Sequence, residues 1–127
     1  MTDNQFSSEE SFLRILEEMN HEGGFSRSVL ATSEGLPIAS APMSPDHELA
    51  SAMIAMLHQV SVETQDHLAL APVDEVTIRT EERVHLVCRT ISSGGDWICL
   101  CALVPPGQVY RRATNKAVRR IREVIEE

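Results

Sequence analysis

Three cysteines and a histidine in the second half of the chain are the residues best suited to metal or redox chemistry. Cys99 and Cys101 stand two positions apart, so on a strand they share one face, and His85 and Cys88 lie in the segment before them. A structural zinc site needs ligand pairs of the C-x2–4-C or H-x3–5-H type, which the C-x-C spacing does not supply. Small cysteines packed in a sheet are commoner. We therefore expect all three cysteines to be buried, structural and reduced, with a metal or redox role as the open alternative.

The sequence contains no catalytic or nucleotide-binding motif. It has no G-x-x-x-x-G-K-[ST] loop to cradle phosphates, no G-x-G-x-x-G fingerprint after a strand and no G-x-S-x-G nucleophile elbow. Its five histidines are scattered, and none stands at a recognisable spacing from a nucleophile and a carboxylate. The sequence therefore predicts a protein that is not an enzyme, with no catalytic residue, no cofactor and no metal.

Basic residues are concentrated near the end of the chain. Residues 1–106 carry five basic and sixteen acidic side chains, whereas residues 107–127 carry six basic and three acidic ones. The six are Arg111, Arg112, Lys116, Arg119, Arg120 and Arg122. They form either a docking surface for an acidic partner, a membrane or nucleic acid, or a solvated helix face that suits the negative end of the helix dipole. We favour the solvated face, because the rest of the chain is strongly acidic. The net charge of −8 and the pI of about 5.1 also argue against a general nucleic-acid binder.

The spacing of apolar residues predicts three helices and five strands. Apolar residues three and four positions apart predict helices, and alternating or continuous apolar runs between turn residues predict strands. The helices span residues 8–21, 45–68 and 108–125, and the strands span residues 25–33, 36–41, 74–80, 84–91 and 97–104. The order α-β-β-α-β-β-β-α predicts an α+β fold, in which a five-stranded antiparallel sheet has helices on both faces.

Individual residues mark the ends and places of these elements. Ser7 and Glu10 form a capping box for the first helix, and Ser44-Pro45 supplies the N-cap and first position of the second. Pro37 has no backbone N–H to donate, so we expect its strand at an edge of the sheet. The apolar run over residues 97–104 predicts a central strand covered on both faces.

The second predicted helix is apolar over more of its circumference than one sheet requires. Its apolar residues span roughly 160°, whereas packing on a single sheet needs only about 100°. They are Leu49, Ala50, Met53, Ile54, Met56, Leu57 and Val60. The strand at 74–80 carries Val76 and Ile78 at an edge of the kind that proteins usually cover. We therefore expect this helix and this strand to form a homodimer interface.

Length and composition indicate one globular domain. A chain of 127 residues with 43% hydrophobic and 24% charged residues is typical of such a domain. We expect residues 1–7 to be a flexible tail and residues 8–127 to be the domain. The first residues show no pattern of a secretory signal, and no run approaches the roughly 18 apolar residues of a membrane helix, so we expect a cytoplasmic protein.

Two adjoining segments resemble the roadblock/dynein light chain family. Residues 33–40, Ser-Glu-Gly-Leu-Pro-Ile-Ala-Ser, are similar to that family's S-x-D/E-G-L-P-I-A-S turn, and residues 48–57 are similar to its E-x-L-A-A-M-x-A-x-L helix. The order of elements agrees over residues 8–125, nearly the whole chain. The chain departs from the family pattern where Pro105-Pro106-Gly107, rather than Asn-x-Gly, leads into the last helix.

This resemblance implies a non-enzymatic homodimer that binds Ras-like small GTPases, as a regulator or a scaffold. Some bacterial members act as the GTPase-activating partner of a gliding-polarity GTPase, others stand beside a GTPase in sensor-kinase operons, and eukaryotic members are dynein or lysosomal scaffold subunits. In such dimers the long helices pair and the third strands join edge to edge. The alternative function is a small-ligand sensor or interaction module of profilin-like or PAS-like shape, which a buried polar pocket would favour.

The expected contact residues lie mainly on the second helix and the strand that follows it. For the dimer interface we expect Ala52, Ile54, Met56, Val76 and Ile78. For the GTPase we expect Ser51, Ala55, His58 and Val62, with Arg119 and Arg120 of the last helix steering an acidic partner. If the chain activates GTP hydrolysis, we expect it to position the GTPase's own residues, because most of its arginines lie on strands or on the last helix rather than on a loop that could insert one.

Overall fold

The computed structural model describes residues 8–43, 47–93 and 95–126. Its elements are α1 (Ser8–Gly23), β1 (Arg27–Thr32), β2 (Pro37–Ala41), α2 (His47–His67), β3 (Glu75–Arg79), β4 (His85–Ser93), β5 (Asp96–Val104) and α3 (Arg111–Ile125). Over these residues the predicted order of elements is confirmed, and their ends differ from the predicted ends by a few residues. The expected caps at Ser7 and Ser44-Pro45 and the expected tail at 1–7 lie outside the described residues.

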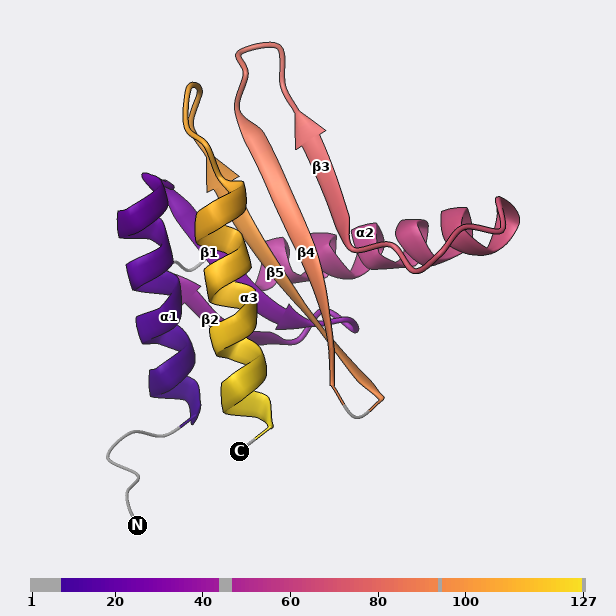
Figure 1. Ribbon diagram of the computed structural model, residues 1–127, viewed down its shortest axis with the longest axis horizontal. Coiled ribbons are helices and arrows are strands. Elements are labelled where there is room, and N and C mark those ends of the chain that lie inside the picture. Colours follow the sequence, from indigo (N-terminus) through magenta and orange to yellow (C-terminus); the bar gives the residue numbers. More distant parts are fainter. Residues whose placement is uncertain (1–7, 44–46, 94, 127) are drawn as a thin grey trace.

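The strands form one antiparallel sheet in the order β2-β1-β5-β4-β3 (Figure 1). β5 lies at the centre, as its apolar sequence predicts, and residues 99–102 within it are buried. β2, which begins at Pro37, forms one edge, so the missing N–H of this residue costs the sheet no central hydrogen bond. β3 forms the other edge, as the dimer prediction requires.

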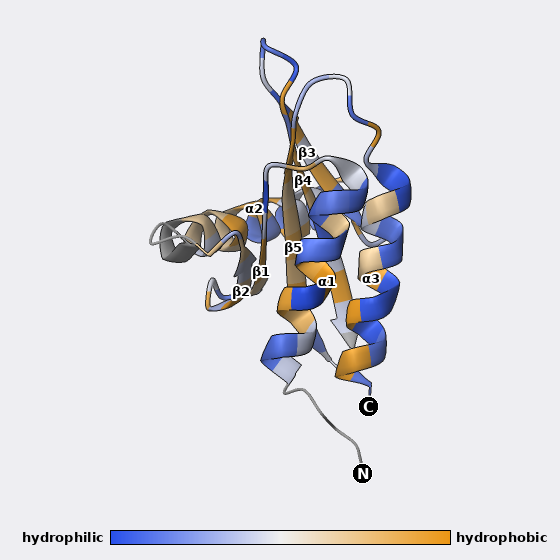
Figure 2. Cartoon of the chain, turned by 90° about the vertical axis from the view of Figure 1, so that its left-hand side faces the viewer, coloured by the Kyte–Doolittle hydropathy of each residue, from blue (hydrophilic) through white to orange (hydrophobic). Residues whose placement is uncertain are grey.

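Helices cover both faces of the sheet, as predicted. α1 and α3 lie side by side on one face, and α2 crosses the other face (Figures 1 and 2). The larger core lies between the sheet and α1 and α3, where Leu16, Leu100 and Ile121 are completely buried. Figure 2 shows the hydrophobic side of α3 turned toward the sheet and its hydrophilic side turned outward. Within the described residues, no helix combines the length and hydropathy that a membrane span requires.

The β1–β2 turn lies against α2. The backbone N–H of Thr32 donates to the carbonyl of Leu36 at 2.9 Å, and the side-chain oxygen of Thr32 accepts the N–H of Leu36 at 3.1 Å. Gly35 has a φ of +93°, and a Cβ at this position would lie 3.3 Å from both the Cβ of Ala55 and the carbonyl oxygen of Ser51. Glycine suits both the positive φ and the close approach, so this turn packs directly on the middle of α2.

The three cysteines lie under α2, and the expected reduced state is wrong for two of them. Cys88 of β4 and Cys101 of β5 stand directly opposite each other, with Cα atoms 4.2 Å apart, and form a disulfide. The sequence shows only that Cys99 and Cys101 share one face of a strand, whereas the register that faces Cys88 with Cys101 is a contact between strands. Cys99 is a free thiol, and burial raises its pKa to about 11. The expectation that all three are buried is confirmed.

Candidate protein-binding site

The outer side of α2 is apolar and exposed. α2 crosses the sheet, and its C-terminal half extends past the edge strand β3 (Figure 1). Met53 is 52% exposed, Met56 67% and Val60 58%, and Ala52 beside them is also exposed. Contiguous apolar side chains on the surface of a small protein mark protein contacts. One part of the wide apolar stripe of α2 therefore packs on the sheet of the same chain, and the other part is exposed to solvent.

The edge strand β3 lies at the edge of the sheet past which α2 extends (Figure 1). β3 pairs with β4 along one side, and its Val76 and Ile78 stand opposite Cys88 and Leu86. Because Cys88 belongs to the core under α2, the side chains of Val76 and Ile78 lie on the α2 side of the sheet. We call Ala52, Met53, Met56, Val60, Val76 and Ile78 the α2–β3 surface. It joins an unpaired strand edge to an apolar helix face.

A cleft runs along the flank of α2, between the helix and the β1–β2 turn. It has a volume of about 480 Å³. Its lining consists of Ser33, Glu34, Ala55, Met56, His58, Gln59, Val62 and Glu63. Three of the residues expected to contact a partner, Ala55, His58 and Val62, therefore line one cleft, which we call the hairpin cleft. Two carboxylates, from Glu34 and Glu63, lie beside these mostly apolar residues.

His58 links the hairpin cleft to the start of the central strand. Its ring lies 5.8 Å from that of Trp97, centroid to centroid, and its buried Nδ1 has no hydrogen-bond partner within the described residues. Trp97 is partly exposed next to it. Sequence reasoning missed Trp97 as a surface residue because it assigned the whole run 97–104 to a covered strand. Strand alternation was the available signal, since it places Trp97 on the same face as Cys99.

Two of the expected contact residues are buried inside the domain. The expectation that Ser51 contacts a partner is wrong, because its side chain is completely buried. Ile54, expected in the dimer interface, is 4% exposed and belongs to the small core under α2. The side of α2 that packs on the sheet contains Ser51, Ile54 and Ser61. The helix is therefore rotated about its own axis relative to the orientation that the apolar stripe predicts. A small polar side chain packs closely on the sheet, while larger apolar ones such as Met56 stay outside.

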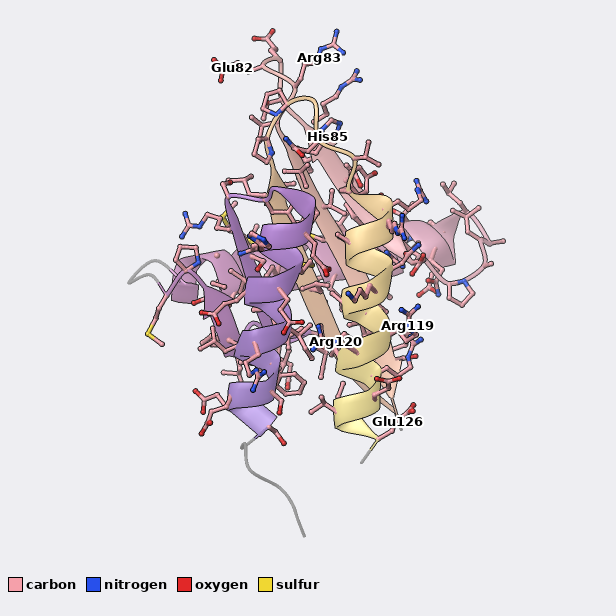
Figure 3. The ribbon with its side chains drawn as sticks, turned by 60° about the vertical axis from the view of Figure 1, so that its left-hand side comes forward. Glu82, Arg83, His85, Arg119, Arg120 and Glu126 are labelled. Atoms are coloured by element: carbon pink, nitrogen blue, oxygen red, sulfur yellow. A yellow bond between two sulfur atoms is a disulfide. The ribbon has the colours of Figure 1, made fainter. Side chains whose placement is uncertain are left out.

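The basic residues of α3 are partly paired with acidic residues of α1. Lys116 forms an ion pair with Glu22 at 2.9 Å, and Arg120 forms one with Glu18. The hydrogen bond from Lys116 is the main cause that lowers the pKa of Glu22. In Figure 3, Arg120 lies between α1 and α3, whereas Arg119 lies on the flank of α3 turned away from α1. Arg120, expected to steer a partner, therefore also joins two helices.

A buried arginine, missed by the sequence analysis, ties α3 to the sheet. Nη1 of Arg89 donates to the Thr114 hydroxyl at 3.2 Å and to Oδ1 of Asn115 at 2.7 Å. Its Nη2 lies 3.5 Å from the carboxylate of Asp74, just before β3. A buried guanidinium requires partners of this kind. The available signal was a charged residue in the middle of a mostly apolar strand, next to Cys88, and such a residue must find polar partners on a neighbouring element.

A small apolar cavity of about 200 Å³ lies beneath the N-terminal half of α2. Met53 and Leu57 line it from the helix, and Leu86 lines it from β4. Over the part of the chain that the structure describes, no three His, Cys, Asp or Glu side chains are placed to hold a metal ion. The lining of this cavity is apolar except for Arg27 and Ser28.

Solved structures of low sequence identity share this fold. The gliding protein MglB from Thermus thermophilus is 16% identical, with 97% of this chain and 94% of that chain covered and a TM-score of 0.81. MglB from Myxococcus xanthus is 11% identical, with 99% and 93% covered and a TM-score of 0.83. A Roadblock/LC7 domain from Streptomyces avermitilis is 16% identical, with 91% and 98% covered and a TM-score of 0.81. These likenesses show a common architecture.

Comparison of the sequence with protein families identifies the family of this chain. Among curated proteins, none matches this chain. The Roadblock/LC7 domain family, however, matches residues 12–101. That segment extends from α1 to β5, so it includes the β1–β2 turn, α2 and the edge strand β3. The chain belongs to the Roadblock/LC7 domain family.

Proposed function

We propose that this protein is a homodimeric regulator or scaffold that binds a Ras-like small GTPase. The observation that carries the proposal is that one helix, α2, borders both the open α2–β3 surface and the hairpin cleft. The first provides an apolar face beside an unpaired strand edge, and the second provides a separate place for a partner. Family membership and the resemblance of residues 33–57 to GTPase-binding relatives indicate what that partner is.

The α2–β3 surface supports the homodimer. A two-fold axis at β3 would pair this strand with its copy and satisfy the backbone groups of the open edge. The same operation would bring the protruding half of each α2 beside the sheet of the other protomer. Met53, Met56 and Val60 would then leave water together with Val76 and Ile78. We expect an obligate interface of this kind to bury more than about 2,000 Å² in total.

The hairpin cleft supports binding of a protein partner beside that dimer interface. Ala55 and Val62 are small enough for a partner's backbone to approach α2 closely, and His58 and Trp97 add amphipathic surface at the edge. The sequence has no phosphate-cradling loop. We therefore propose that the GTPase supplies the nucleotide site and the chemistry, while this cytoplasmic protein acts by positioning residues of the GTPase.

The proposal is tested by calorimetric titration of a candidate Ras-like small GTPase from the same organism into this protein. The GTPase is loaded in turn with GDP and with a non-hydrolysable GTP analogue. We expect binding that differs between the two nucleotide states by at least about tenfold in Kd. Absence of binding in both states contradicts the proposal.

A variant in the hairpin cleft locates the contact. Val62→Arg places a long cation in the cleft, and we expect it to weaken GTPase binding at least about tenfold while the protein stays dimeric. Val62 is a better probe than Ala55, because Ala55 packs against Gly35. Val109→Arg is the matched control, since Val109 is 82% exposed and lies just before α3. Equal binding by Val62→Arg and the parent removes the hairpin cleft from the contact.

A further inference from the structure

Pairing and helix stability account for only some of the six basic side chains on α3. Lys116 and Arg120 are bound by carboxylates of α1. Burial raises the pKa of Glu75, whereas its hydrogen bonds lower it. The charge of Arg111 has a smaller effect and also lowers this pKa, so Arg111 lies close to the carboxyl. Arg122 stands in the last turn, where a cation suits the negative end of the helix dipole. The remaining two, Arg112 and Arg119, need another explanation.

Arg112 and Arg119 are exposed, and no partner for either lies among the residues that the structure describes. Arg112 lies in the first turn of α3, at the positive end of the dipole, where a cation destabilises the helix. That turn has no acidic residue, and the N-cap residue Tyr110 makes no capping hydrogen bond with its side chain. Over the described residues, neither arginine forms an ion pair or hydrogen bond with a carboxylate. The stability of α3 therefore gives no reason for cations at these two positions.

The two unpaired arginines lie on one side of α3. They are seven residues apart, which is two helical turns and about 10 Å along the axis. Arg122 follows about 4.5 Å further along, on the adjoining side and away from α1. We call Arg112, Arg119 and Arg122 the α3 arginine surface. Its three Cα atoms span about 15 Å along the helix axis, the length of roughly three helical turns or five extended residues.

The α3 arginine surface has a fixed support and lies apart from α2. Asn115 stands between Arg112 and Arg119 and accepts a hydrogen bond from the buried Arg89 of β4 at 2.7 Å. α3 covers the face of the sheet opposite to α2 (Figures 1 and 2), and Figure 3 shows Arg119 on its outer flank. A molecule bound to these arginines would therefore leave the hairpin cleft and the α2–β3 surface open.

We propose that the α3 arginine surface docks an acidic segment of a second protein, whose carboxylates are spaced to match the three arginines. Guanidinium groups bind carboxylates through paired, charge-assisted hydrogen bonds. The small extent of the surface favours a short protein segment over a membrane or nucleic acid. An extended polyanion would also meet the carboxylates of Glu123 and Glu126 and the strongly acidic remainder of the chain, within a screening length of about 8–10 Å. This site is independent of the proposed GTPase contact and makes the protein able to join two partners.

The test is fluorescence anisotropy with a labelled helical peptide that carries glutamates at the spacing of the three arginines. A peptide with glutamine in place of each glutamate is the control. We expect the glutamate peptide to bind the full protein. Its affinity should fall at least about tenfold when the ionic strength rises from about 0.05 M to about 0.5 M. Equal binding of the glutamine peptide overturns the proposal, as does tighter binding to phosphatidylserine vesicles or duplex DNA than to the glutamate peptide.

Charge reversal locates the site on the protein. The double variant Arg112→Glu/Arg119→Glu should bind the glutamate peptide at least about tenfold more weakly than the parent does. It should also bind a peptide that carries lysines at the same positions more tightly than the parent does. Arg83→Glu, in the exposed turn between β3 and β4 (Figure 3), is the control for net charge and should bind like the parent. The double variant should fold as the parent does, because Glu at position 112 suits the start of the helix. Unchanged peptide binding by a folded double variant overturns the proposal.

Discussion

At the scale of single residues, Gly35 is the position where a side chain would most directly disturb the contact between the β1–β2 turn and α2. Gly35→Ala adds a Cβ that meets Ala55 and the backbone of Ser51, at a φ that L side chains rarely adopt. We expect it to lower the free energy of unfolding by about 1–3 kcal/mol, measured by urea denaturation. Gly107→Ala is the control, since φ there is +84° but the space is open. Equal losses in the two variants would show that the contact with α2 contributes nothing.

The cysteines make a second prediction at this scale. In denaturant without reductant we expect one thiol, Cys99, to be alkylated, and with reductant we expect all three cysteines to react. Mass spectrometry counts the added groups. In the folded protein Cys99 should resist alkylation near pH 8, because burial raises its pKa to about 11 and thiolate is the reactive form. Alkylation of all three cysteines without reductant would contradict the disulfide and support the reduced state that the sequence predicts.

The raised pKa of Cys99 also predicts how stability depends on pH. The folded protein holds the thiol proton to about pH 11, whereas an unburied thiol releases it near 9.0. Between these values the unfolded state binds fewer protons, so the free energy of unfolding falls as the pH rises. Cys99→Ala should lose this part of the decline, which denaturation at pH 8 and pH 10.5 measures. An equal decline in parent and variant would contradict the assignment.

At the scale of elements, one hydrogen bond joins the residue before α3 to the edge strand β3. The Tyr110 hydroxyl donates to the carboxylate of Glu75 at 3.0 Å, and Thr77 donates to the same oxygen at 2.6 Å. Burial by itself raises the pKa of Glu75, but these hydrogen bonds and the charges of Arg111 and Arg89 lower it below its usual value. The stabilisation is therefore present at neutral pH and is lost as the pH falls through the pKa of the folded state.

Tyr110→Phe tests this link between two elements. We expect it to lower the free energy of unfolding by about 1 kcal/mol at neutral pH and to raise the pKa of Glu75, followed by carbon NMR of the carboxyl group. The difference in stability from the parent should shrink in acid, where Glu75 is protonated in both proteins. A difference that is the same at pH 7 and in acid would assign the effect to packing instead of to the hydrogen bond.

The exposed side of α2 makes a prediction about assembly. Val60→Asp places a charge in the middle of the α2–β3 surface, outside the hairpin cleft. Because Val60 is exposed within one chain, we expect little change in the folding of the protomer but a dimer dissociation constant raised at least about a hundredfold. Analytical ultracentrifugation measures it, with Val109→Asp as the control. If Val60→Asp dimerises as tightly as the control, another surface forms the dimer.

Across these elements, the sequence predicts what local patterns determine and misses what depends on contacts between distant segments. The period of apolar residues identifies every helix and strand that the structure describes, and Pro37 correctly marks an edge strand. The rotation of α2 that buries Ser51 follows from packing on the sheet, and the pairing of Cys88 with Cys101 follows from strand register. Composition predicts the basic helix α3, but only the position of α1 shows which of its cations are paired.

At the scale of the whole molecule, the sheet separates two different surfaces. One face carries α2, with the exposed α2–β3 surface and the hairpin cleft. The other face carries α1 and α3, with paired charges between the helices and with Arg119 on the outer flank of α3. A dimer built through β3 would present both surfaces twice. This arrangement suits a protein that brings a GTPase and a second, acidic partner together.

The mass of the protein in solution, alone and mixed with a candidate Ras-like small GTPase, tests the central claim most directly. Light scattering after size exclusion should give twice the chain mass of 14.1 kDa for the protein alone at micromolar concentration. Mixed with the GTPase in its preferred nucleotide state, the peak should gain the mass of the GTPase, and it should stay unchanged in the other state. A mass of 14.1 kDa alone, with no added mass in either nucleotide state, would contradict the account.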